Sequence, residues 1–138
     1  MFHQALALDN NNADALYCLG LCWQNEYDFY RAMDFYTRAL KVQPNLPEVY
    51  NNIGNLYYDH EGDYKGAIGF FEKAIAAASD PLHHSLIPVY QNLSKLYRQM
   101  MDEEKADYYE RKWFECMGLE LFFDLAHGSS DEDDDPDE

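Results

Sequence analysis

The sequence predicts an all-α solenoid of antiparallel helix pairs, because it repeats itself along the chain. Residues 16–23 (LYCLGLCW) return as residues 50–57 (YNNIGNLY) and again as residues 90–97 (YQNLSKLY). The first two copies are each followed by a second pattern of alanine, an aromatic residue and alanine, over residues 32–39 and 67–74. Repeated segments at this spacing indicate stacked supersecondary units, and the two halves of each unit indicate two helices.

Small and aromatic residues have steric roles in this repeat. Gly20 and Gly54 should let the two helices of one repeat approach closely, since glycine has no Cβ atom. The alanines, such as Ala32 and Ala39, should let neighbouring repeats stack. The expected core then receives large aromatic side chains, each stabilising by about 1.5–3 kcal/mol when buried: Trp23, Tyr36, Tyr57, Phe71 and Tyr97.

These patterns resemble the tetratricopeptide repeat (TPR) family, whose signature combines an aromatic residue or Leu with Leu-Gly, Tyr, Ala, Phe and Pro. The resemblance covers about residues 1–112 and implies a right-handed superhelical solenoid with a concave groove. The expected domains are residues 1–12, the end of a preceding repeat and a loop; 13–46, repeat 1; 47–79, repeat 2; 80–112, a divergent repeat 3; 113–127, a C-terminal capping helix; and 128–138, a disordered acidic tail.

The start of the chain reads as part of a repeat. Phe2 and Ala5 fit the end of a helix from an earlier repeat, which favours a segment cut from a longer solenoid over a degenerate half-repeat that serves as a cap. Repeat 1 should then place helices over residues 13–25 and 29–42. The second of these ends before Pro44, because proline cannot continue a helix.

Repeat 2 begins at Pro47, in a position where proline is favoured in the first turn of a helix. Its first helix should reach about His60, and its second should run over residues 64–77. Gly62 lies one residue later than the family pattern places the turn glycine. We therefore expect a one-residue insertion in this turn.

Repeat 3 departs from the pattern. The segment that links repeat 2 to repeat 3 is longer than the link between the first two repeats. Asp80-Pro81 within this segment is typical of the start of a helix. Pro88 argues instead for a break or kink, because a proline inside a helix removes a backbone hydrogen bond. Downstream, Glu110 and Trp113 stand where the pattern has an aromatic and a small residue. The bulk of Trp113 indicates that no ordinary repeat stacks next.

An apolar stripe predicts a terminal helix over about residues 113–126. The stripe consists of Phe114, Met117, Leu121, Phe122 and Leu125. Their three- and four-residue spacing is typical of one side of a helix. Together with Phe123, these residues form a possible oligomer or partner face. The favoured interpretation is a cap that covers the last apolar face of the solenoid. The alternative is that Phe122, Phe123 and Leu125 dock on a second chain or in a groove of another molecule.

The resemblance also implies which residues line the concave groove, since family members use the first helix of each pair. By alignment these residues are Tyr17, Cys18, Leu21, Asn51, Asn52, Asn55, Tyr58, Gln91, Asn92, Lys95 and Arg98. Asn52 and Asn92 fall at equivalent positions. An amide both donates and accepts hydrogen bonds, so such a pair can bind the backbone of an extended peptide. The alternative is a helix face that is merely solvated.

Relatives that bind chaperone tails use a carboxylate clamp of Lys, Asn and Arg in this groove. Tyr17 and Leu21 stand where the first lysine and asparagine of that clamp belong, so we do not expect that activity. Lys95 and Arg98, at one end of the groove, are the cations expected to be available to an acidic group.

The charge balance restricts the class of partner. The net charge is −16, and seven of the negative charges lie in residues 131–138. Such a surface repels phosphate backbones, so we expect no nucleic-acid binding and favour basic protein partners. The sequence also has no run of roughly 18 apolar residues and no N-terminal signal segment. We therefore expect no membrane association and a cytoplasmic location.

The acidic tail allows three interpretations. It cannot form a packed core, so its simplest role is solubility. Ser129 and Ser130 precede acidic residues, as in the sites preferred by acid-directed serine kinases. The tail alternatively occupies a basic groove or holds a basic partner.

Catalytic and cofactor motifs are absent from the sequence. It has no glycine-rich phosphate loop, no nucleophile elbow and no pair of histidines spaced on a helix as zinc ligands. His60, His83 and His84 are expected in solvent, and the cysteines Cys18, Cys22 and Cys116 are expected as structural thiols. We therefore expect no enzyme, cofactor, metal or small-molecule substrate.

Three functions are consistent with these observations. The first is a protein-protein interaction module that binds an extended peptide and acts as an adaptor or scaffold in a larger assembly. The second is a homo-oligomer that assembles through the terminal apolar helix or the N-terminal half-repeat. The third is an acidic chaperone for basic proteins. The asparagine positions favour the first.

Overall fold

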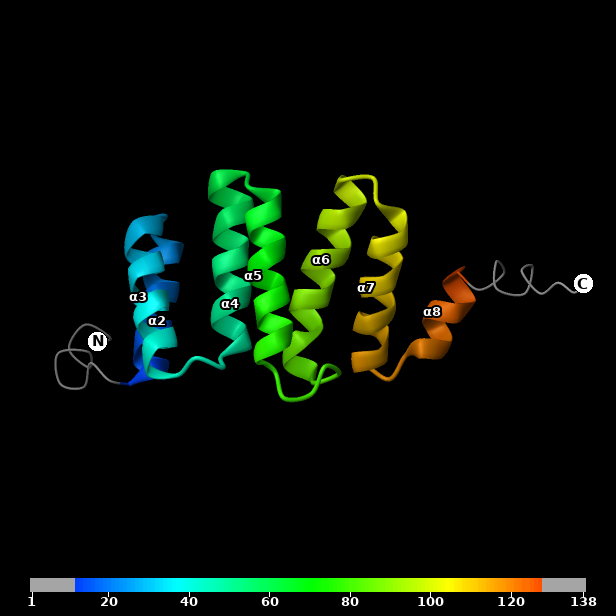
Figure 1. Ribbon diagram of the computed structural model, residues 1–138, viewed down its shortest axis with the longest axis horizontal. Helices are drawn as coiled ribbons and strands as arrows, with labels where there is room; N and C mark the ends of the chain where they lie inside the picture. The colour runs from blue at the N-terminus through cyan, green and yellow to red at the C-terminus, as the bar shows by residue number, and fades with distance from the viewer. Residues whose placement is uncertain (1–11, 128–138) are drawn as a thin grey trace, which may run out of the picture. The chain divides into compact units, whose positions relative to one another are not determined.

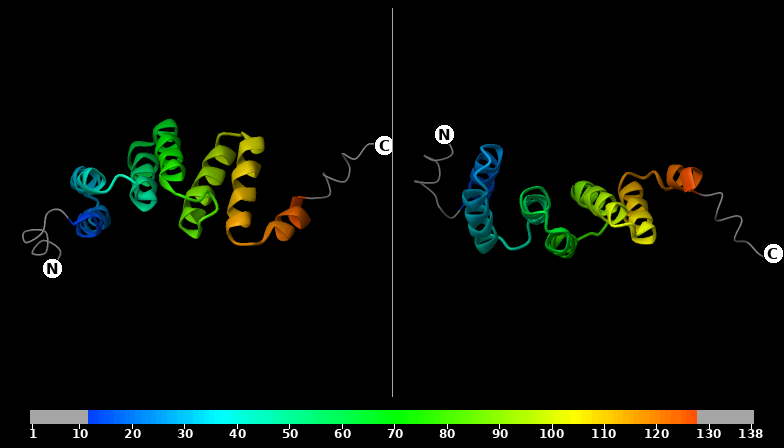
Figure 2. Two further views of the ribbon diagram at one scale, coloured as in Figure 1. Left: turned by 60° about the horizontal axis from the view of Figure 1, so that its bottom comes forward. Right: turned by 90° about the horizontal axis from the view of Figure 1, so that it is seen from above.

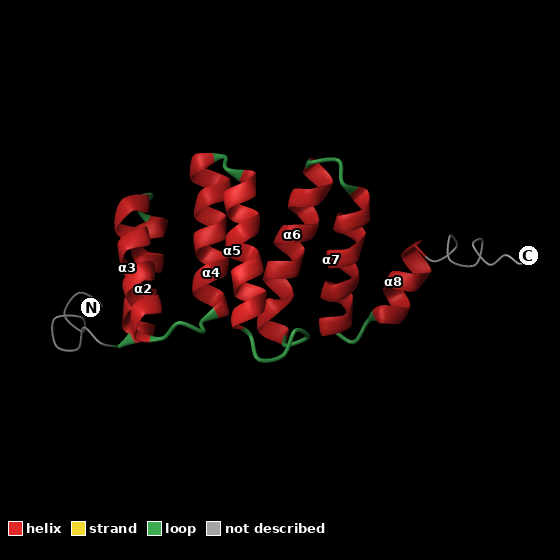
Figure 3. Ribbon diagram, viewed as in Figure 1, coloured by secondary structure: helices red, strands yellow, loops and turns green. Residues whose placement is uncertain are grey.

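The computed structural model describes residues 12–127, and every regular element in this range is helical (Figure 3). The described chain contains seven α-helices, one π-helical turn and one 3-10 helix (Figure 1). It divides between Ser79 and Asp80 into two compact units. None of the helices in the described range has the length and hydropathy needed to cross a bilayer. The expected N-terminal half-repeat, the acidic tail and its two serines lie outside these residues.

Unit 1 contains two helix pairs, whose members lie side by side in each view (Figures 1 and 2). Its elements are α2 (Ala13–Asn25), α3 (Phe29–Val42), α4 (Pro47–Leu56), the π-helical turn η1 (Tyr57–Glu61) and α5 (Tyr64–Ala77). Helix α2 packs on α3, α4 packs on α5, and α3 also contacts α4. Helices α2, α3 and α5 begin and end at the residues that the sequence predicts.

Local caps explain these boundaries. Asn12, Asp28 and Asp63 each accept a hydrogen bond from the backbone N–H three residues later, at 3.0, 3.1 and 2.9 Å. Side-chain caps of this kind stabilise a helix by about 1 kcal/mol. Pro47 occupies the first turn of α4, where its missing N–H costs no hydrogen bond.

The predicted one-residue insertion in repeat 2 is found as η1. A π-helical turn bonds each residue to the fifth along the chain and so accommodates one residue more than an α-helical turn. Gly62 follows with a φ of 64°, a left-handed conformation that glycine adopts without a Cβ penalty. The Asp63 N–H then donates to the Tyr57 carbonyl at 3.0 Å and closes the turn.

In both pairs of unit 1, an aromatic ring lies directly on a glycine. Tyr36 of α3 packs on Gly20 of α2, and Phe71 of α5 packs on Gly54 of α4. Both rings are buried, with exposures of 0% and 1%. The glycines therefore set the close approach of the two helices in each repeat. The core between α3 and α4 consists of Ala32, Tyr36, Val49, Ile53 and Leu56.

Unit 2 contains a third helix pair and a short final helix. Its elements are the 3-10 helix η2 (His84–Leu86), α6 (Ile87–Gln99), α7 (Glu103–Cys116) and α8 (Glu120–His127). Helix α6 packs on α7, and α7 contacts α8. The buried apolar residues of the pair are Leu86, Val89, Tyr90, Leu93, Leu96, Tyr97 and Ala106.

The helix start expected at Asp80-Pro81 is wrong. The Asp80 carboxylate accepts a hydrogen bond from the backbone N–H two residues later, at 3.0 Å, and forms a turn instead. Helix α6 begins one residue before Pro88, so this proline lies in its first turn. The Tyr90 hydroxyl donates to the Pro81 carbonyl at 2.7 Å and holds the turn against α6. Burial raises the pKa of Tyr90 to about 12, so this donor is neutral at physiological pH.

The single helix expected over residues 113–126 is also wrong, because it is divided between α7 and α8. Gly118 separates them, with a φ of 70°. Its N–H donates to the Glu115 carbonyl at 3.0 Å, and the Leu119 N–H donates to the Phe114 carbonyl at 2.8 Å. This pair of bonds is the Schellman motif that ends a helix at glycine. The apolar stripe therefore continues across a turn.

Candidate functional site

Two of the predicted groove residues in unit 1 are joined by a hydrogen bond. The Asn52 Nδ2 of α4 donates to the Tyr17 Oη of α2 at 3.1 Å. The Tyr17 and Tyr36 ring centroids lie 6.1 Å apart, and the Tyr36 hydroxyl donates to the Gln24 Oε1 at 2.5 Å. Burial raises the pKa of Tyr17 and of Tyr36, which keeps both hydroxyls neutral. Asn52 therefore fixes α4 against α2, whatever else it binds.

The other predicted groove residues of unit 1 belong to α2, α4 and η1. All are half-buried: Cys18, Leu21, Asn51, Asn55 and Tyr58. The Tyr58 ring contacts the Tyr64 ring, with centroids 5.3 Å apart and the ring planes tilted by 31°. Burial raises the pKa of the Cys18 and Cys116 thiols, and all three cysteines are free. These two thiols are thereby disfavoured as thiolate nucleophiles.

Charges are distributed unequally between the helices of unit 1. Helices α2 and α4, with η1, carry acidic residues and no lysine or arginine: Asp14, Glu48, Asp59 and Glu61. Helices α3 and α5 carry the cations of the described part of unit 1: Arg31, Arg38, Lys41, Lys65 and Lys73. The helices that carry the predicted groove residues of this unit therefore have a negative net charge, which favours a neutral or basic ligand over an acidic one.

In unit 2, three predicted groove residues line an open cleft of about 760 Å³ between α6, α7 and α8. They are Gln91, Lys95 and Arg98, all from α6. Asn92 lies half-buried on the same helix. The structure thus brings the α6 residues together at a cleft that has polar groups on its walls.

The cleft lies where repeat 3 departs from the repeat pattern. Ser94 takes the position that Gly20 and Gly54 hold in the first two repeats, and Glu110 takes the position of the buried aromatic ring. Both residues line the cleft, together with Trp113. In repeat 3, a cleft whose lining residues are mostly polar therefore takes the place of the contact between ring and glycine that is found in each pair of unit 1.

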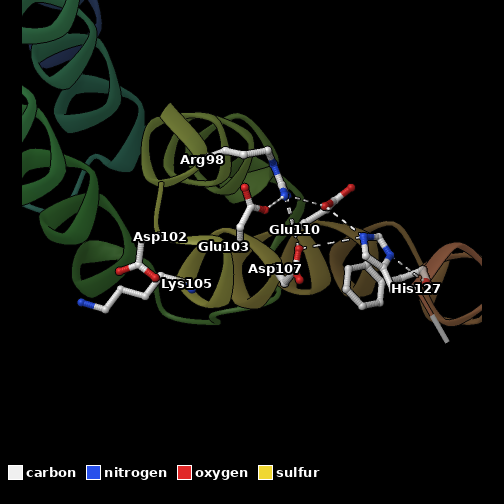
Figure 4. A network of polar contacts seen from close by, with 8 residues as sticks. Arg98, Asp102, Glu103, Lys105, Asp107, Glu110 and His127 are labelled. Carbon is white, nitrogen blue, oxygen red and sulfur yellow. Dashed lines mark hydrogen bonds and ion pairs between the residues drawn. The ribbon is translucent and has the colours of Figure 1, made fainter. Parts of the chain in front are cut away.

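Arg98 is surrounded by three carboxylates (Figure 4). Its guanidinium nitrogens lie 2.6 Å from the Glu103 Oε1, 3.4 Å from the Asp107 Oδ1 and 2.9 Å from the Glu110 Oε1. Three negative charges outnumber the one positive charge, so this network repels an acidic group. This geometry argues against the expectation that Arg98 offers its charge to an acidic ligand. Arg98 instead links α6 to α7.

His127 connects α8 to the same network (Figure 4). Its Nε2 lies 3.6 Å from the Glu110 Oε1 and 3.9 Å from the Asp107 Oδ1, and its Nδ1 lies 3.1 Å from the Phe123 carbonyl oxygen. One donor atom from each of Asp107, Glu110 and His127 lies within 4.8 Å of the others, which is the grouping that a metal site needs. The guanidinium of Arg98 already contacts both carboxylates, however. We therefore assign this cluster as a polar link between α7 and α8.

The apolar stripe at the end of the described chain has two sides. Phe123 is 2% exposed, and its ring meets the Phe114 ring edge to face with centroids 5.7 Å apart. Met117, in the turn, accepts a hydrogen bond on its sulfur from the Trp113 Nε1 at 2.9 Å. The outer side of α8 exposes 58–72% of three large apolar side chains: Leu121, Phe122 and Leu125.

Sequence reasoning missed two features of the structure, one in each unit. The network around Arg98 had one signal in the sequence, because Glu110 stands where the pattern has an aromatic residue. The second feature is a small pocket between α3 and the turn η1 in unit 1, lined mainly by aromatic residues and by Glu61. Its signal was the displaced Gly62, which marks the insertion that forms η1.

Successive antiparallel helix pairs with ring-on-glycine contacts place this chain among the α-helical repeat proteins, in which neighbouring units bury one another's apolar faces. A family model of the tetratricopeptide repeat matches residues 49–85. The chain belongs to the tetratricopeptide repeat family. Domains of this family are generally protein-protein interaction modules and are typically non-catalytic.

Known proteins with the same repeats resemble this chain over most of its length. Anaphase-promoting complex subunit 6 of Arabidopsis thaliana is 33% identical over 94 residues, which cover 67% of this chain and 17% of that protein. The structure of PilF from Pseudomonas aeruginosa matches with a TM-score of 0.73 and 23% identity, covering 93% of this chain and 59% of that chain. YrrB, described as a TPR protein with an unusual peptide-binding site, matches with a TM-score of 0.69 and 22% identity, covering 95% and 68%. These two structures show the shared fold alone.

The chain spans only part of its relatives. It covers 17–42% of the length of the curated proteins that it matches. The activities and partners of those whole proteins therefore do not transfer to this chain directly.

Proposed function

We propose that this chain is a non-enzymatic adaptor or scaffold module whose groove binds an extended peptide segment of a partner protein. The observation that carries the proposal is the equivalent placement of Asn52 on α4 and Asn92 on α6, each half-buried on the first helix of its pair. An extended peptide presents alternating N–H and C=O groups, and an amide side chain can pair with both. The proposal includes a cytoplasmic location.

Two further observations support peptide binding within a larger assembly. The elements of unit 1 that carry the predicted groove residues combine amides and tyrosines with acidic residues, and this composition suits a neutral or basic peptide. YrrB is described as a TPR protein with an unusual peptide-binding site. Two other similar proteins are anaphase-promoting complex subunit 6 and the type IV pilus assembly protein PilF.

Replacing both asparagines tests the proposal. The Asn52→Ala, Asn92→Ala double variant is expected to bind a partner peptide about 25-fold more weakly, because each lost hydrogen bond removes about 1 kcal/mol. Partners captured from lysate by the unmodified chain would be divided into overlapping peptides. The affinity of each peptide for both proteins would then be measured by calorimetry. An affinity that the double variant leaves unchanged would contradict the proposal.

Tyr17→Phe is the matched control for the structural role of Asn52. It removes the hydroxyl that Asn52 contacts at 3.1 Å but leaves the amide in place. Peptide affinity should therefore change much less in Tyr17→Phe than in Asn52→Ala alone. Because Tyr17 is itself a predicted groove residue, equal losses in the two variants would show that the Asn52 amide contributes nothing beyond its pairing with the Tyr17 hydroxyl.

A second candidate function is self-association through the outer side of α8, which the exposure of Leu121, Phe122 and Leu125 favours. Exposed apolar clusters of this kind are typical of interfaces. The chain should then dimerise with increasing concentration in analytical ultracentrifugation, and Leu121→Glu with Leu125→Glu should yield a monomer. A chain that stays monomeric at the highest concentration reached would exclude this function.

A further inference from the structure

Unit 1 contains a small pocket whose lining includes none of the predicted groove residues. It has a volume of about 260 Å³ and lies between α3 and the end of α4 with η1. Ligand pockets for small molecules usually occupy roughly 300–1,000 Å³. This pocket is therefore sized for one side chain of a partner and not for a larger ligand.

The walls of the pocket are mainly aromatic. Helix α3 supplies Phe29 and Tyr30, and the turn η1 supplies Tyr57 and His60. The Phe29 and His60 rings are in contact, with centroids 4.0 Å apart and their planes tilted by 32°, so α3 and η1 meet at this pocket. Tyr30 is 89% exposed and forms the open edge. The inserted residue of the π-helical turn thus contributes to a preformed aromatic site, as such turns frequently do at functional sites.

The charge at the pocket is negative. Glu61 lines it, and no lysine or arginine is among its lining residues in the described chain. The nearest cation along α3 is Arg31, which is already engaged. Its Nε lies 3.6 Å from the Asp28 carboxylate, and its guanidinium lies 4.6 Å from the centre of the Trp23 ring. An incoming cation would therefore meet aromatic faces and a carboxylate with no competing positive charge from the pocket.

We propose that this pocket binds one basic side chain, arginine or lysine, of a partner polypeptide. The aliphatic stem would lie on the Phe29, Tyr30 and Tyr57 rings, and the cationic head would face Glu61. Aromatic faces attract cations through their ring quadrupole. The chain uses the same contact internally, since the Arg111 guanidinium lies 4.5 Å from the centre of the Phe123 ring. A neutral apolar side chain would leave the Glu61 carboxylate without a partner of opposite charge.

Titration with single-residue probes tests this proposal directly. Backbone amide NMR spectra of the full chain would be recorded with N-acetylarginine amide, N-acetylcitrulline amide and N-acetylleucine amide. Citrulline keeps the shape of arginine but has no charge. The arginine probe should bind with a dissociation constant on the order of millimolar and shift the amides of Phe29–Met33 and Tyr57–Glu61. The other two probes should bind at least about threefold more weakly.

Two variants and one charge-matched control complete the test. Glu61→Gln and Tyr30→Ala each should weaken the arginine probe about threefold, since an exposed ion pair and an exposed cation–π contact are both modest interactions. Glu72→Gln, an exposed residue of α5, removes an equal charge away from the pocket and should have no effect. Equal binding of leucine or citrulline, shifts that map elsewhere, or an unchanged Glu61→Gln variant would overturn the proposal. The groove proposal rests on other residues and would be unaffected.

Discussion

Gly54→Ala is expected to lower the free energy of unfolding by about 3 kcal/mol. A Cβ atom at this position would lie 2.5 Å from the Phe71 Cε1, well inside the contact distance of two carbons. The Phe71 ring is 1% exposed and cannot move aside without displacing its neighbours. Urea unfolding followed by circular dichroism would measure the loss. Gly20→Ala, which meets the buried Tyr36 ring, should behave in the same way.

Gly69→Ala is the matched control. Gly69 also lies within a helix, but a Cβ atom there would meet nothing within 4 Å. The change should therefore raise the free energy of unfolding by about 0.5–1 kcal/mol, because alanine loses less conformational entropy in a helix than glycine. If Gly54→Ala were as stable as Gly69→Ala, the ring-on-glycine contact would not hold the pair together.

Phe123→Ala is expected to release α8 from α7. Phe123 is the buried anchor of this helix, in contact with the Phe114 ring and beneath the Arg111 guanidinium. Removing a buried phenylalanine costs about 3–5 kcal/mol, and a helix of eight residues is too short to persist without tertiary contacts. Hydrogen exchange followed by mass spectrometry should show that the amides of α8 lose their protection, while those of α6 keep theirs.

Phe122→Ala separates the loss of anchoring from the loss of a large side chain. Phe122 is 58% exposed on the outer side of the same helix. Its truncation should leave the protection of α8 nearly unchanged. Comparable loss of protection in the Phe122 and Phe123 variants would show that α8 is not held by its inner side.

Much of the fold was predictable because its signals are local. Helices α2, α3 and α5 begin after capping side chains and end near proline or at turns, and the sequence displays these residues directly. The insertion at Gly62 was likewise visible from spacing. The predictions of two helix boundaries were wrong, and each error has a physical reason. Asp80 caps a turn as readily as a helix, and Gly118 ends α7 inside a stripe whose apolar spacing continues unbroken.

The candidate site was less predictable, because its decisive contacts join different helices. The hydrogen bond between Asn52 and Tyr17 links residues from different repeats, and no spacing within either repeat indicates it. The charge on Arg98 was visible, but the three carboxylates around it come from the next helix of the pair. The roles of Asn52 and Asn92 in peptide binding stay predictions.

The contact between ring and glycine also couples two positions of the repeat. A side chain added at Gly20 or Gly54 would meet a buried ring, and removal of that ring would leave a cavity beside the glycine. Either change alone should therefore destabilise the helix pair, whereas the two changes together remove both the clash and the need to fill the space. Repeat 3, with Ser94 and Glu110, differs from repeats 1 and 2 at both positions. The two positions are therefore expected to vary together between repeats and not independently.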